Sequence, residues 1–162
     1  MKSVERVRSA LIAAGVGDVI IELPESARTA QMAADALSKH LNTPVPVGAI
    51  VKSLVFLADG RPVLVLVAGD RRGDAEKLKA VLGASEIKMA DGETVRAATG
   101  FAIGGVPPVG HRDGLPVLVD RSLSRFETVY AAAGHPNAVF PILYTRLVEA
   151  AQGRPADVTQ DE

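Results

Sequence analysis

The chain has 162 residues, which fits one domain, and its 48% hydrophobic and 23% charged residues are typical of a globular protein. It contains no cysteine, which excludes a disulfide framework, a thiolate metal site and a cysteine nucleophile. The net charge of −1 gives no basic excess, so any contact with nucleic acid must come from local patches. The first residues lack the apolar core of a signal peptide, and no apolar run reaches the ~20 residues of a membrane span. We therefore expect a cytoplasmic protein with no membrane partner.

The first half of the chain alternates helical and strand patterns. From the apolar spacing we expect helices over residues 3–14 and 30–41 and strands over residues 19–23, 50–58 and 62–68. Thr29 precedes the second helix and can cap it. The Asp59-Gly60 dipeptide predicts a tight hairpin between the last two strands. Because residues 63–67 are all apolar, the second strand of this hairpin is expected to lie inside the sheet, covered on both faces.

The second half continues in the same way. We expect helices over residues 75–82, 91–99 and 146–152 and strands over residues 115–120, 128–132 and 138–143, with a short unassigned segment over residues 86–89. Asp74 and Thr145 are the expected N-caps of the first and last of these helices, and Pro141 places the last strand at a sheet edge. Helices and hairpins are interspersed without a strict strand-helix-strand rhythm, which indicates an α+β fold. We therefore expect a single domain over residues 1–152, with a mixed, mostly antiparallel and barrel-like sheet surrounded by helices, and a flexible tail over residues 153–162.

Lys52 interrupts an otherwise apolar strand face. Side chains alternate along a strand, so Lys52 shares one face with Ile50, Leu54 and Phe56. Burying an ammonium group is costly unless a partner compensates for its charge. Two explanations remain open from this pattern alone. The lysine either extends to a sheet edge or pairs with a buried carboxylate, or it serves a binding or catalytic site.

A glycine- and proline-rich segment, residues 100–111, follows the helix expected at 91–99. Its glycines permit positive φ and close approach of a ligand, while its adjacent prolines stiffen the chain. Successive exposed N–H groups can bind an anion, although a tight connection between elements would need the same residues. The segment lacks both the Gly-Lys-Ser/Thr of a phosphate-binding loop and the glycine spacing of a dinucleotide-binding one. His111, at its end, is either a base or hydrogen-bond donor or a solvent-facing turn residue.

Four basic residues form the best local candidate for a tRNA contact: Arg71, Arg72, Lys77 and Lys79. Acidic neighbours dilute their charge, so a solvated helix face explains the same pattern. The three histidines do not have metal-ligand spacing, and the chain has no Gly-x-Ser-x-Gly turn of a serine hydrolase. We therefore expect no metal and no cofactor.

Together these segments resemble the YbaK/EbsC family, the prolyl-tRNA-synthetase-associated editing domain. The similarity extends over about residues 20–150 in the family's order of motifs. The matching segments are 27–34 in the opening helix, 50–56 around the lysine, 65–70 in the next strand, 99–110 in the glycine loop, 120–123 and 132–137. The lysine strand combined with the Gly-Gly-Val-Pro-Pro-x-Gly loop is specific, whereas neither is specific alone.

The resemblance implies an aminoacyl-tRNA deacylase. Lys52 is expected to be its essential catalytic residue, and residues 104–108 are expected to form the loop that positions the aminoacyl ester. The expected substrate-binding residues are Arg28, Thr29, Ser53, Gly104, Gly105, Val106, Pro107, Pro108, Gly110, His111, Asp120 and Gly134. Ser53 stands where the alanine-specific branch of the family typically has asparagine, and Pro107 where that branch tends to have threonine.

The chain contains no synthetase catalytic domain and therefore resembles a free-standing, trans-acting editing protein. The implied substrates are mischarged tRNAs of the Cys-tRNA(Pro) or Ala-tRNA(Pro) class. The implied partner is the aminoacyl-tRNA acceptor end, with an aminoacyl-tRNA synthetase as a second candidate. Two alternatives remain: a catalytically silent module that binds tRNA ends or a small ligand, and a protein that docks on a synthetase. Lys52 with an intact glycine loop favours the enzyme, whereas the weak charge and scarce aromatic residues favour help from a partner.

Overall fold

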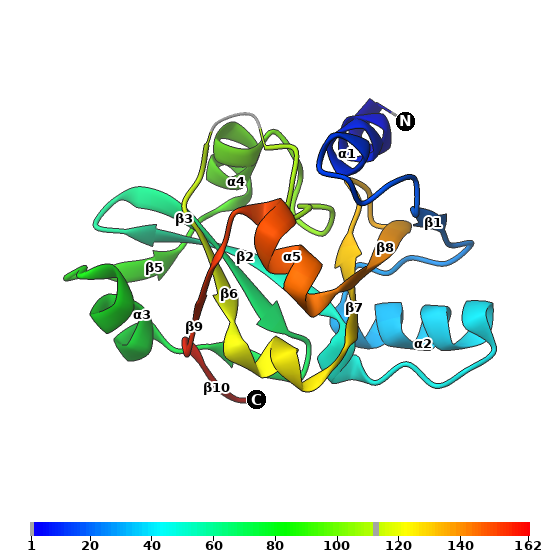
Figure 1. Cartoon of the computed structure of the whole chain (residues 1–162). Helices are drawn as coiled ribbons and strands as arrows, with labels where there is room; N and C mark the ends of the chain where they lie inside the picture. Colours follow the sequence, from blue (N-terminus) through cyan, green and yellow to red (C-terminus); the bar gives the residue numbers. More distant parts are fainter. Residues whose placement is uncertain (1, 112–113) are drawn as a thin grey trace.

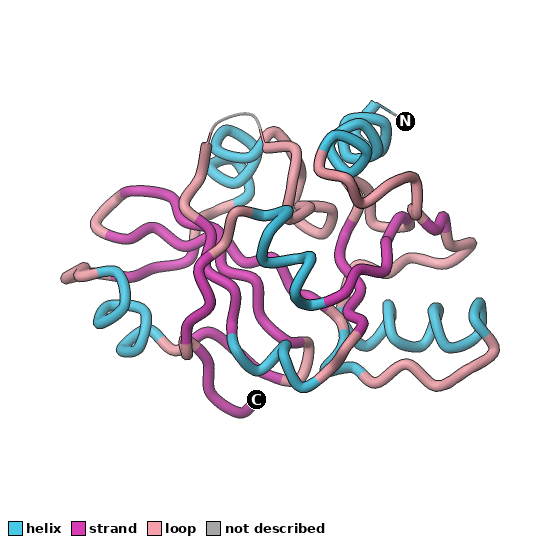
Figure 2. Tube along the Cα trace, viewed as in Figure 1, coloured by secondary structure: helices cyan, strands magenta, loops and turns pink. Residues whose placement is uncertain are grey.

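The computed structural model describes residues 2–111 and 114–162 and shows helices and strands interspersed along the chain (Figures 1 and 2). The α-helices are α1 (Lys2–Ala13), α2 (Ala30–Leu41), α3 (Ala75–Leu82), α4 (Gly92–Thr99) and α5 (Tyr144–Ala151), and short 3-10 helices are η1 (Val47–Ala49) and η2 (Arg121–Arg125). The strands are β1 (Ile21–Glu22), β2 (Val51–Ala58), β3 (Arg61–Ala68), β4 (Arg71–Gly73), β5 (Ile87–Met89), β6 (Val117–Asp120), β7 (Thr128–Ala132), β8 (Ala138–Leu143), β9 (Arg154–Ala156) and β10 (Thr159–Asp161). None of the helices formed by these residues combines the length and apolar character that crossing a membrane requires.

Local capping signals set most of the helix boundaries. The side chain of Thr29 accepts a hydrogen bond from a backbone N–H in the first turn of α2, as expected. Asp74 and Asp91 cap α3 and α4 in the same way. The expected cap of α5 is wrong, because Leu143 occupies the N-cap position without a side-chain hydrogen bond and Thr145 lies inside the helix. β8 runs directly into α5, which leaves no loop residue to supply a polar cap.

The largest sheet has five strands in the order β5-β2-β3-β6-β9 (Figure 1). β2 and β3 form the expected antiparallel hairpin, in which Lys52 lies opposite Val67. On its other side β3 runs parallel to β6, so the prediction that residues 62–68 lie inside the sheet is confirmed. β6 also pairs in parallel with β9, which makes the sheet mixed.

The barrel-like arrangement expected from the sequence is wrong. Among the described strands, β1, β8 and β7 form a separate three-stranded sheet, and β10 pairs with β4. The two larger sheets are joined by an isolated bridge between Ile50 and Tyr130, so the hydrogen-bond ladder does not continue around a closed barrel. The expected edge position of residues 138–143 is wrong, because β8 lies between β1 and β7 in its sheet. Pro141 is tolerated there because it lies beyond the short pairing with β1, where no described strand needs its N–H.

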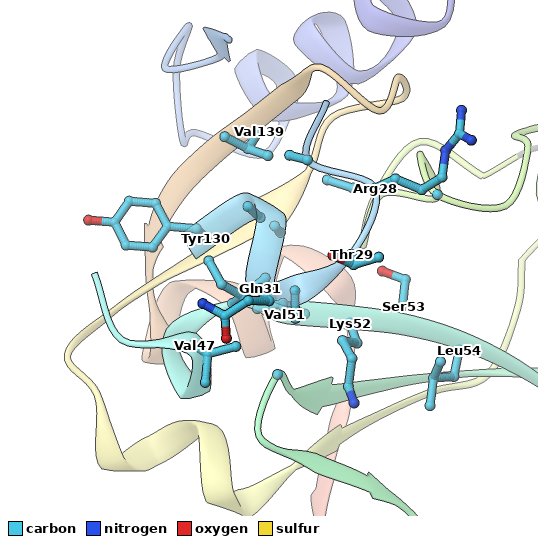
Figure 3. A pocket seen from close by; sticks show the side chains of 18 of the residues that line it. Arg28, Thr29, Gln31, Val47, Val51, Lys52, Ser53, Leu54, Tyr130 and Val139 are labelled. Carbon is cyan, nitrogen blue, oxygen red and sulfur yellow. The ribbon is translucent and has the colours of Figure 1, made fainter. Parts of the chain in front are cut away.

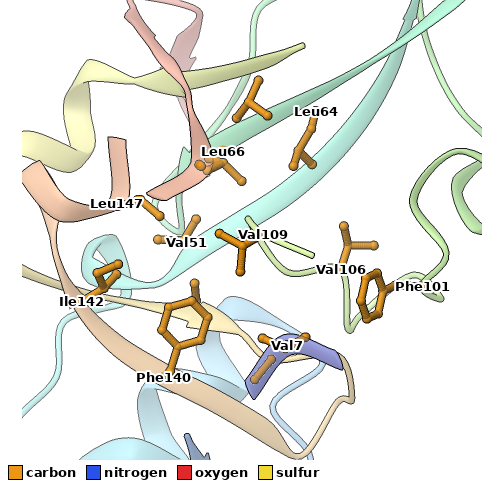
Figure 4. Packing of buried hydrophobic residues seen from close by; sticks show 14 of the residues in the cluster. Val7, Val51, Leu64, Leu66, Phe101, Val106, Val109, Phe140, Ile142 and Leu147 are labelled. Carbon is orange, nitrogen blue, oxygen red and sulfur yellow. The ribbon is translucent and has the colours of Figure 1, made fainter. Parts of the chain in front are cut away.

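Apolar side chains cover both faces of the five-stranded sheet. On one face, α1, α4, α5 and the three-stranded sheet pack against β2 and β3 in a cluster that includes Phe140 and Val51 (Figure 4). On the other face, Leu78 of α3 packs with Val65 of β3. In a third cluster, α2 packs against β8 and Ile50. The start of β2 therefore lies where the first and third clusters meet.

Residues 153–162 differ from the expected flexible tail. Residues 154–156 form β9 beside β6, and residues 159–161 form β10 beside β4. Between them, Val158 packs among core residues of the five-stranded sheet and is fully buried. Burial of this side chain and the added backbone pairing offset the entropy lost on ordering the segment. The C-terminal segment is therefore part of the folded unit.

Candidate functional site

A pocket of about 710 Å³ opens beside the N-terminal half of β2 (Figure 3). Its walls come from the segment that precedes α2, from β2 and β7, and from the loop after α4. The expected site residues that line it are Arg28, Thr29, Lys52, Ser53, Gly104 and Val106. The volume lies in the range of small-molecule sites, roughly 300–1,000 Å³.

Along the outer edge of β2, the pocket lies between the bridge of Ile50 to Tyr130 and the strand β5. β5 pairs with β2 at residues 56–58, and Ala90 extends this contact by donating its N–H to the Val55 carbonyl at 3.0 Å. Backbone groups alternate in direction along an antiparallel strand, so the N–H and C=O of Ser53 point to the same side as those of Val55. The backbone groups of Ser53 are therefore directed to the outer edge of β2, on which the pocket opens.

Lys52 lines this pocket and points away from Ser53, to the opposite side of β2 (Figure 3). Its side chain is 22% exposed, and its Nζ lies 3.0 Å from a carboxylate oxygen of Glu162. The sequence left open whether this lysine pairs with a buried carboxylate or serves a site. The partner is a surface residue, 58% exposed, that itself lines the pocket. Lys52 is therefore a pocket residue whose charge is neutralised from the rim and not from the core.

The Ser53 hydroxyl is buried and has no hydrogen-bond partner among the described residues. It points toward the Thr29 side of the pocket (Figure 3). Leaving such a buried polar group unsatisfied costs about 1–3 kcal/mol. A ligand that offers a donor or an acceptor at this point recovers that free energy. Ser53 is therefore a candidate contact for a bound substrate.

The glycine loop borders the pocket through Gly104. This residue has a φ of +92°, and a Cβ in its place would lie 3.3 Å from Cγ of Arg28. In the part of the chain that the structure describes, the Gly104 N–H has no hydrogen-bond partner. Gly105, in contrast, donates its N–H to the Ala102 carbonyl at 3.0 Å and accepts from the Gly134 N–H at 2.9 Å. The loop thus offers a ligand the amide of Gly104 and not that of Gly105.

Several expected substrate-binding residues lie outside the pocket. They are Gly105, Pro107, Pro108, Gly110, His111, Asp120 and Gly134. A Cβ on Gly105 would lie 2.9 Å from backbone atoms of Gly134 and His135. A Cβ on Gly134 would in turn lie 2.7 Å from the Ser3 carbonyl oxygen of α1. These two glycines therefore allow close backbone packing behind the pocket.

His111 borders a second cavity, of about 430 Å³, together with residues of α1 and α5. Its Nε2–H donates to the Pro107 carbonyl at 2.7 Å. Burial lowers the pKa of His111, and this hydrogen bond opposes the shift without cancelling it. The imidazole is therefore neutral at pH 7 and fastens the end of the glycine loop.

Asp120 is a buried structural carboxylate, 1% exposed. It accepts hydrogen bonds from the Ser122 N–H at 3.2 Å and from the Ser122 hydroxyl at the start of η2. It also accepts from the Val158 N–H at 3.1 Å and from the Thr159 hydroxyl at 2.9 Å. Asp120 thus ties the C-terminal segment to β6 and does not reach the pocket.

The basic residues expected to contact tRNA are already paired. Their partners are Asp161 for Arg71 (2.6 Å), Asp157 for Lys77 (3.1 Å), Glu76 for Lys79 (3.1 Å) and the side chain of Gln160 for Arg72 (3.4 Å). All but one of these partners belong to residues 157–161. The charge of the patch is therefore compensated mainly by the C-terminal segment, whose order the sequence did not reveal.

Asp70 and Tyr130 also line the pocket, although neither was expected there from its place in the sequence. Arg125 donates two hydrogen bonds to the Asp70 carboxylate, at 2.7 and 2.9 Å. This guanidinium holds the pKa of Asp70 below its ordinary value, against the opposing effect of burial. Asp70 is therefore an anionic rim residue whose charge is already satisfied.

The chain is similar to one protein family and to solved structures. A model of the aminoacyl-tRNA editing domain family matches residues 24–150. The crystal structure of a candidate trans-editing enzyme for prolyl tRNA synthetase is 39% identical, with a TM-score of 0.87 over 99% of this chain and 98% of that chain. A structure from work on epitope backbone grafting onto scaffold proteins is 36% identical, with a TM-score of 0.88 over 100% of this chain and 99% of that chain.

Curated relatives include proline–tRNA ligases. The ligase of Nitratidesulfovibrio vulgaris is 44% identical over 79 residues, and that of Lactobacillus acidophilus is 33% identical over 120 residues. The matched segments cover 49% and 74% of this chain but 14% and 21% of the two ligases. The chain therefore spans about a fifth or less of the length of these relatives.

Proposed function

Because this chain belongs to the aminoacyl-tRNA editing domain family, we propose that it hydrolyses the ester of mischarged tRNA in trans, in the pocket beside β2. Family membership confirms the resemblance and the enzyme class expected from the sequence, an aminoacyl-tRNA deacylase. The observation that carries the proposal is the convergence of Lys52, the unpartnered Ser53 hydroxyl and Gly104 at one pocket. Action in trans is supported by the candidate trans-editing enzyme, of which this chain covers 98%.

The two sides of the β2 edge suit two parts of an aminoacyl-tRNA end. Lys52 points to one side, where its ammonium group can hold the terminal phosphate and so fix the position of the ester. Ser53 and the Gly104 N–H lie at the same pocket, where they can contact the ester and the negative charge that develops on its carbonyl oxygen. The attacking oxygen belongs to a water molecule, and the free terminal ribose hydroxyl can position it, so that the substrate itself contributes to catalysis.

The pocket lining supports a proposal for the substrate class. Thr29, Ser53 and Tyr130 are among the residues of the pocket wall that can offer a small side chain of the alanine or cysteine type polar and apolar contacts. A larger, correct amino acid is excluded by size, which is how an editing site rejects it. We propose tRNA(Pro) carrying such a small residue as the substrate. The relation to parts of proline–tRNA ligases supports this choice.

A deacylation screen tests the proposal. The wild-type protein and Ser53→Ala are incubated with a panel of tRNAs charged with alanine, cysteine, serine or proline, and the remaining ester is measured over time. We expect hydrolysis of at least one small aminoacyl ester and not of the prolyl ester. Loss of one ligand hydrogen bond, about 0.5–1.5 kcal/mol, should lower kcat/KM of Ser53→Ala about two- to twelvefold.

Ser9→Ala is the matched control, because Ser9 is exposed on α1. It should hydrolyse each substrate at the wild-type rate. If no charged tRNA in the panel is hydrolysed but tRNA still binds in a salt-sensitive way, the silent binding module becomes the better account. Equal rates for Ser53→Ala and wild type would remove Ser53 from the substrate contacts.

A further inference from the structure

Three cations, of which Lys52 lines the pocket, are each paired with an acidic residue of the C-terminal segment. They come from β2, β4 and α3. The pairs are Lys52 with Glu162 (3.0 Å), Arg71 with Asp161 (2.6 Å) and Lys77 with Asp157 (3.1 Å). We call Lys52, Arg71 and Lys77 the cationic track. Its residues face one short acidic segment, which has the charge and the extended shape of a nucleic-acid strand.

The acidic segment is held firmly at its centre. Thr159 is fully buried, and its hydroxyl donates to the buried carboxylate of Asp120 at 2.9 Å. β10 pairs with β4, and the Lys77 ammonium group donates to the Thr159 carbonyl at 2.7 Å. The segment therefore remains docked at Thr159 even if the side chains beyond it change partners.

The contacts beyond Thr159 are weaker. The Asp161 side chain is 94% exposed and that of Glu162 is 58% exposed. Each pair joins a half-buried cation, 22% exposed, to a carboxylate that water reaches, so water screens the carboxylate's charge and ordering its side chain costs entropy. A phosphate can therefore replace either carboxylate at little cost. Lys52 and Nη1 of Arg71 are then free to bind it, while the Arg71 Nε–H still donates to the Thr159 hydroxyl at 2.6 Å.

We propose that Asp161 and Glu162 act as an internal mimic of RNA phosphates, which covers Lys52 and Arg71 and is displaced when the acceptor end of tRNA binds. This inference rests on the proposed function, because it names the partner of the same site as an RNA strand. In this proposal, Glu162 controls which anions reach Lys52. With its carboxylate on Lys52, the pocket is closed to anions that bind weakly and opens to a polyanion that engages Arg71 as well.

The test compares wild type with the double variant Asp161→Asn/Glu162→Gln. Binding of an uncharged acceptor-stem RNA hairpin is measured by fluorescence anisotropy between 50 and 200 mM salt. Each freed cation is expected to steepen the slope of log K against log salt by about 0.7. Two freed cations should make the slope steeper by about 1.4. At the lowest salt the variant should bind roughly two- to fivefold more tightly, the size expected for loss of exposed competing pairs.

The matched control is Asp35→Asn/Glu149→Gln, which changes the net charge equally. Asp35 contacts Gln31 on α2, and Glu149 pairs with Arg146 on α5, so neither touches the track. Its affinity and slope should stay close to those of wild type. A third protein adds Lys52→Gln to the double variant and should lose about half of the gain in slope. This step separates the local effect of freeing Lys52 from a general change in charge.

Equal or weaker RNA binding by the double variant, with an unchanged slope, would overturn the proposal. No measurable RNA binding by any of the proteins would do the same. Failure of the deacylase function is a different result, because it would appear as wild-type protein that binds the uncharged hairpin but hydrolyses no charged tRNA. Thermal melting of each variant shows whether the fold is intact, and the anchor at Thr159 is present in all of them.

Discussion

Replacing Asp120 by asparagine tests whether this carboxylate is an anchor or a substrate contact. One of its oxygens accepts from the Val158 N–H, and the other accepts from the Ser122 N–H and from the Thr159 hydroxyl. An asparagine amide has a single acceptor oxygen, and its NH2 group can only donate. Whichever way the amide is turned, one backbone N–H therefore faces another donor.

The size of the effect follows from these contacts. An unsatisfied buried donor costs about 1–3 kcal/mol, and the remaining bonds lose the strength that a charged acceptor gives them. We expect Asp120→Asn to lower the free energy of unfolding by about 2–4 kcal/mol in total. For a chain of this length, 1 kcal/mol corresponds to a Tm change of about 2–4 °C, so the variant should melt about 4–16 °C below wild type.

Thermal and urea unfolding, followed by circular dichroism, measure this loss. Hydrogen exchange at Val158 should also become faster, because its N–H loses its carboxylate partner. Asp35→Asn is the control, since Asp35 is exposed on α2, and its Tm should be nearly that of wild type. The reasoning is refuted if Asp120→Asn melts like wild type while deacylation falls, because the carboxylate would then act on the substrate.

Further variants probe the glycine loop and its histidine. Gly105→Ala should lower the free energy of unfolding by about 1–3 kcal/mol, because the added Cβ meets the backbone of Gly134. Gly114→Ala is the control and should melt like wild type, because a Cβ there meets no atom of the described residues within 4 Å. An unchanged Tm for Gly105→Ala would show that the two backbones are not in contact. Burial lowers the pKa of His111 in the folded protein below its ordinary value of 6.5. The neutral imidazole therefore contributes its full stabilisation above pH 6.5, and this stabilisation is lost as the pH falls toward the pKa of the folded state. The Tm of His111→Gln, which can still donate to Pro107, should therefore fall less than that of wild type between pH 7 and pH 5. Parallel curves of Tm against pH for the two proteins would contradict this role of His111.

Local signals in the sequence were sufficient for most of the regular elements. The β2–β3 hairpin follows from two apolar runs around Asp59-Gly60, and the cap at Thr29 from a polar residue before a helical pattern. β4, β9 and β10 were not predicted, because strands of three residues carry no readable alternation and form through pairing with distant strands. The prediction of a barrel-like sheet was wrong for a related reason, because no local sequence pattern indicates whether two sheets join.

Some residues of the candidate site could likewise be predicted from local sequence patterns, whereas others depend on contacts between distant segments. Lys52 was recognisable because a cation on an apolar strand face needs an explanation, and Gly104 because a glycine-rich loop permits close approach of a ligand. The partner of Lys52 was not recognisable, because Glu162 lies 110 residues further along the chain. Asp120 was assigned to the substrate through its place in a motif, and only the fold reveals that it holds Thr159.

Single-turnover deacylation of a mischarged tRNA by wild type and Lys52→Ala tests the central claim most directly. Lys39→Ala is the matched control, because Lys39 is a surface lysine, 74% exposed, that pairs with Glu25 away from the pocket. We predict that Lys52→Ala lowers the rate about 10²–10³-fold, since the ester loses its fixed position and a nearby positive charge, while its melting curve and the control's rate stay unchanged. Hydrolysis by Lys52→Ala at the wild-type rate would contradict the account.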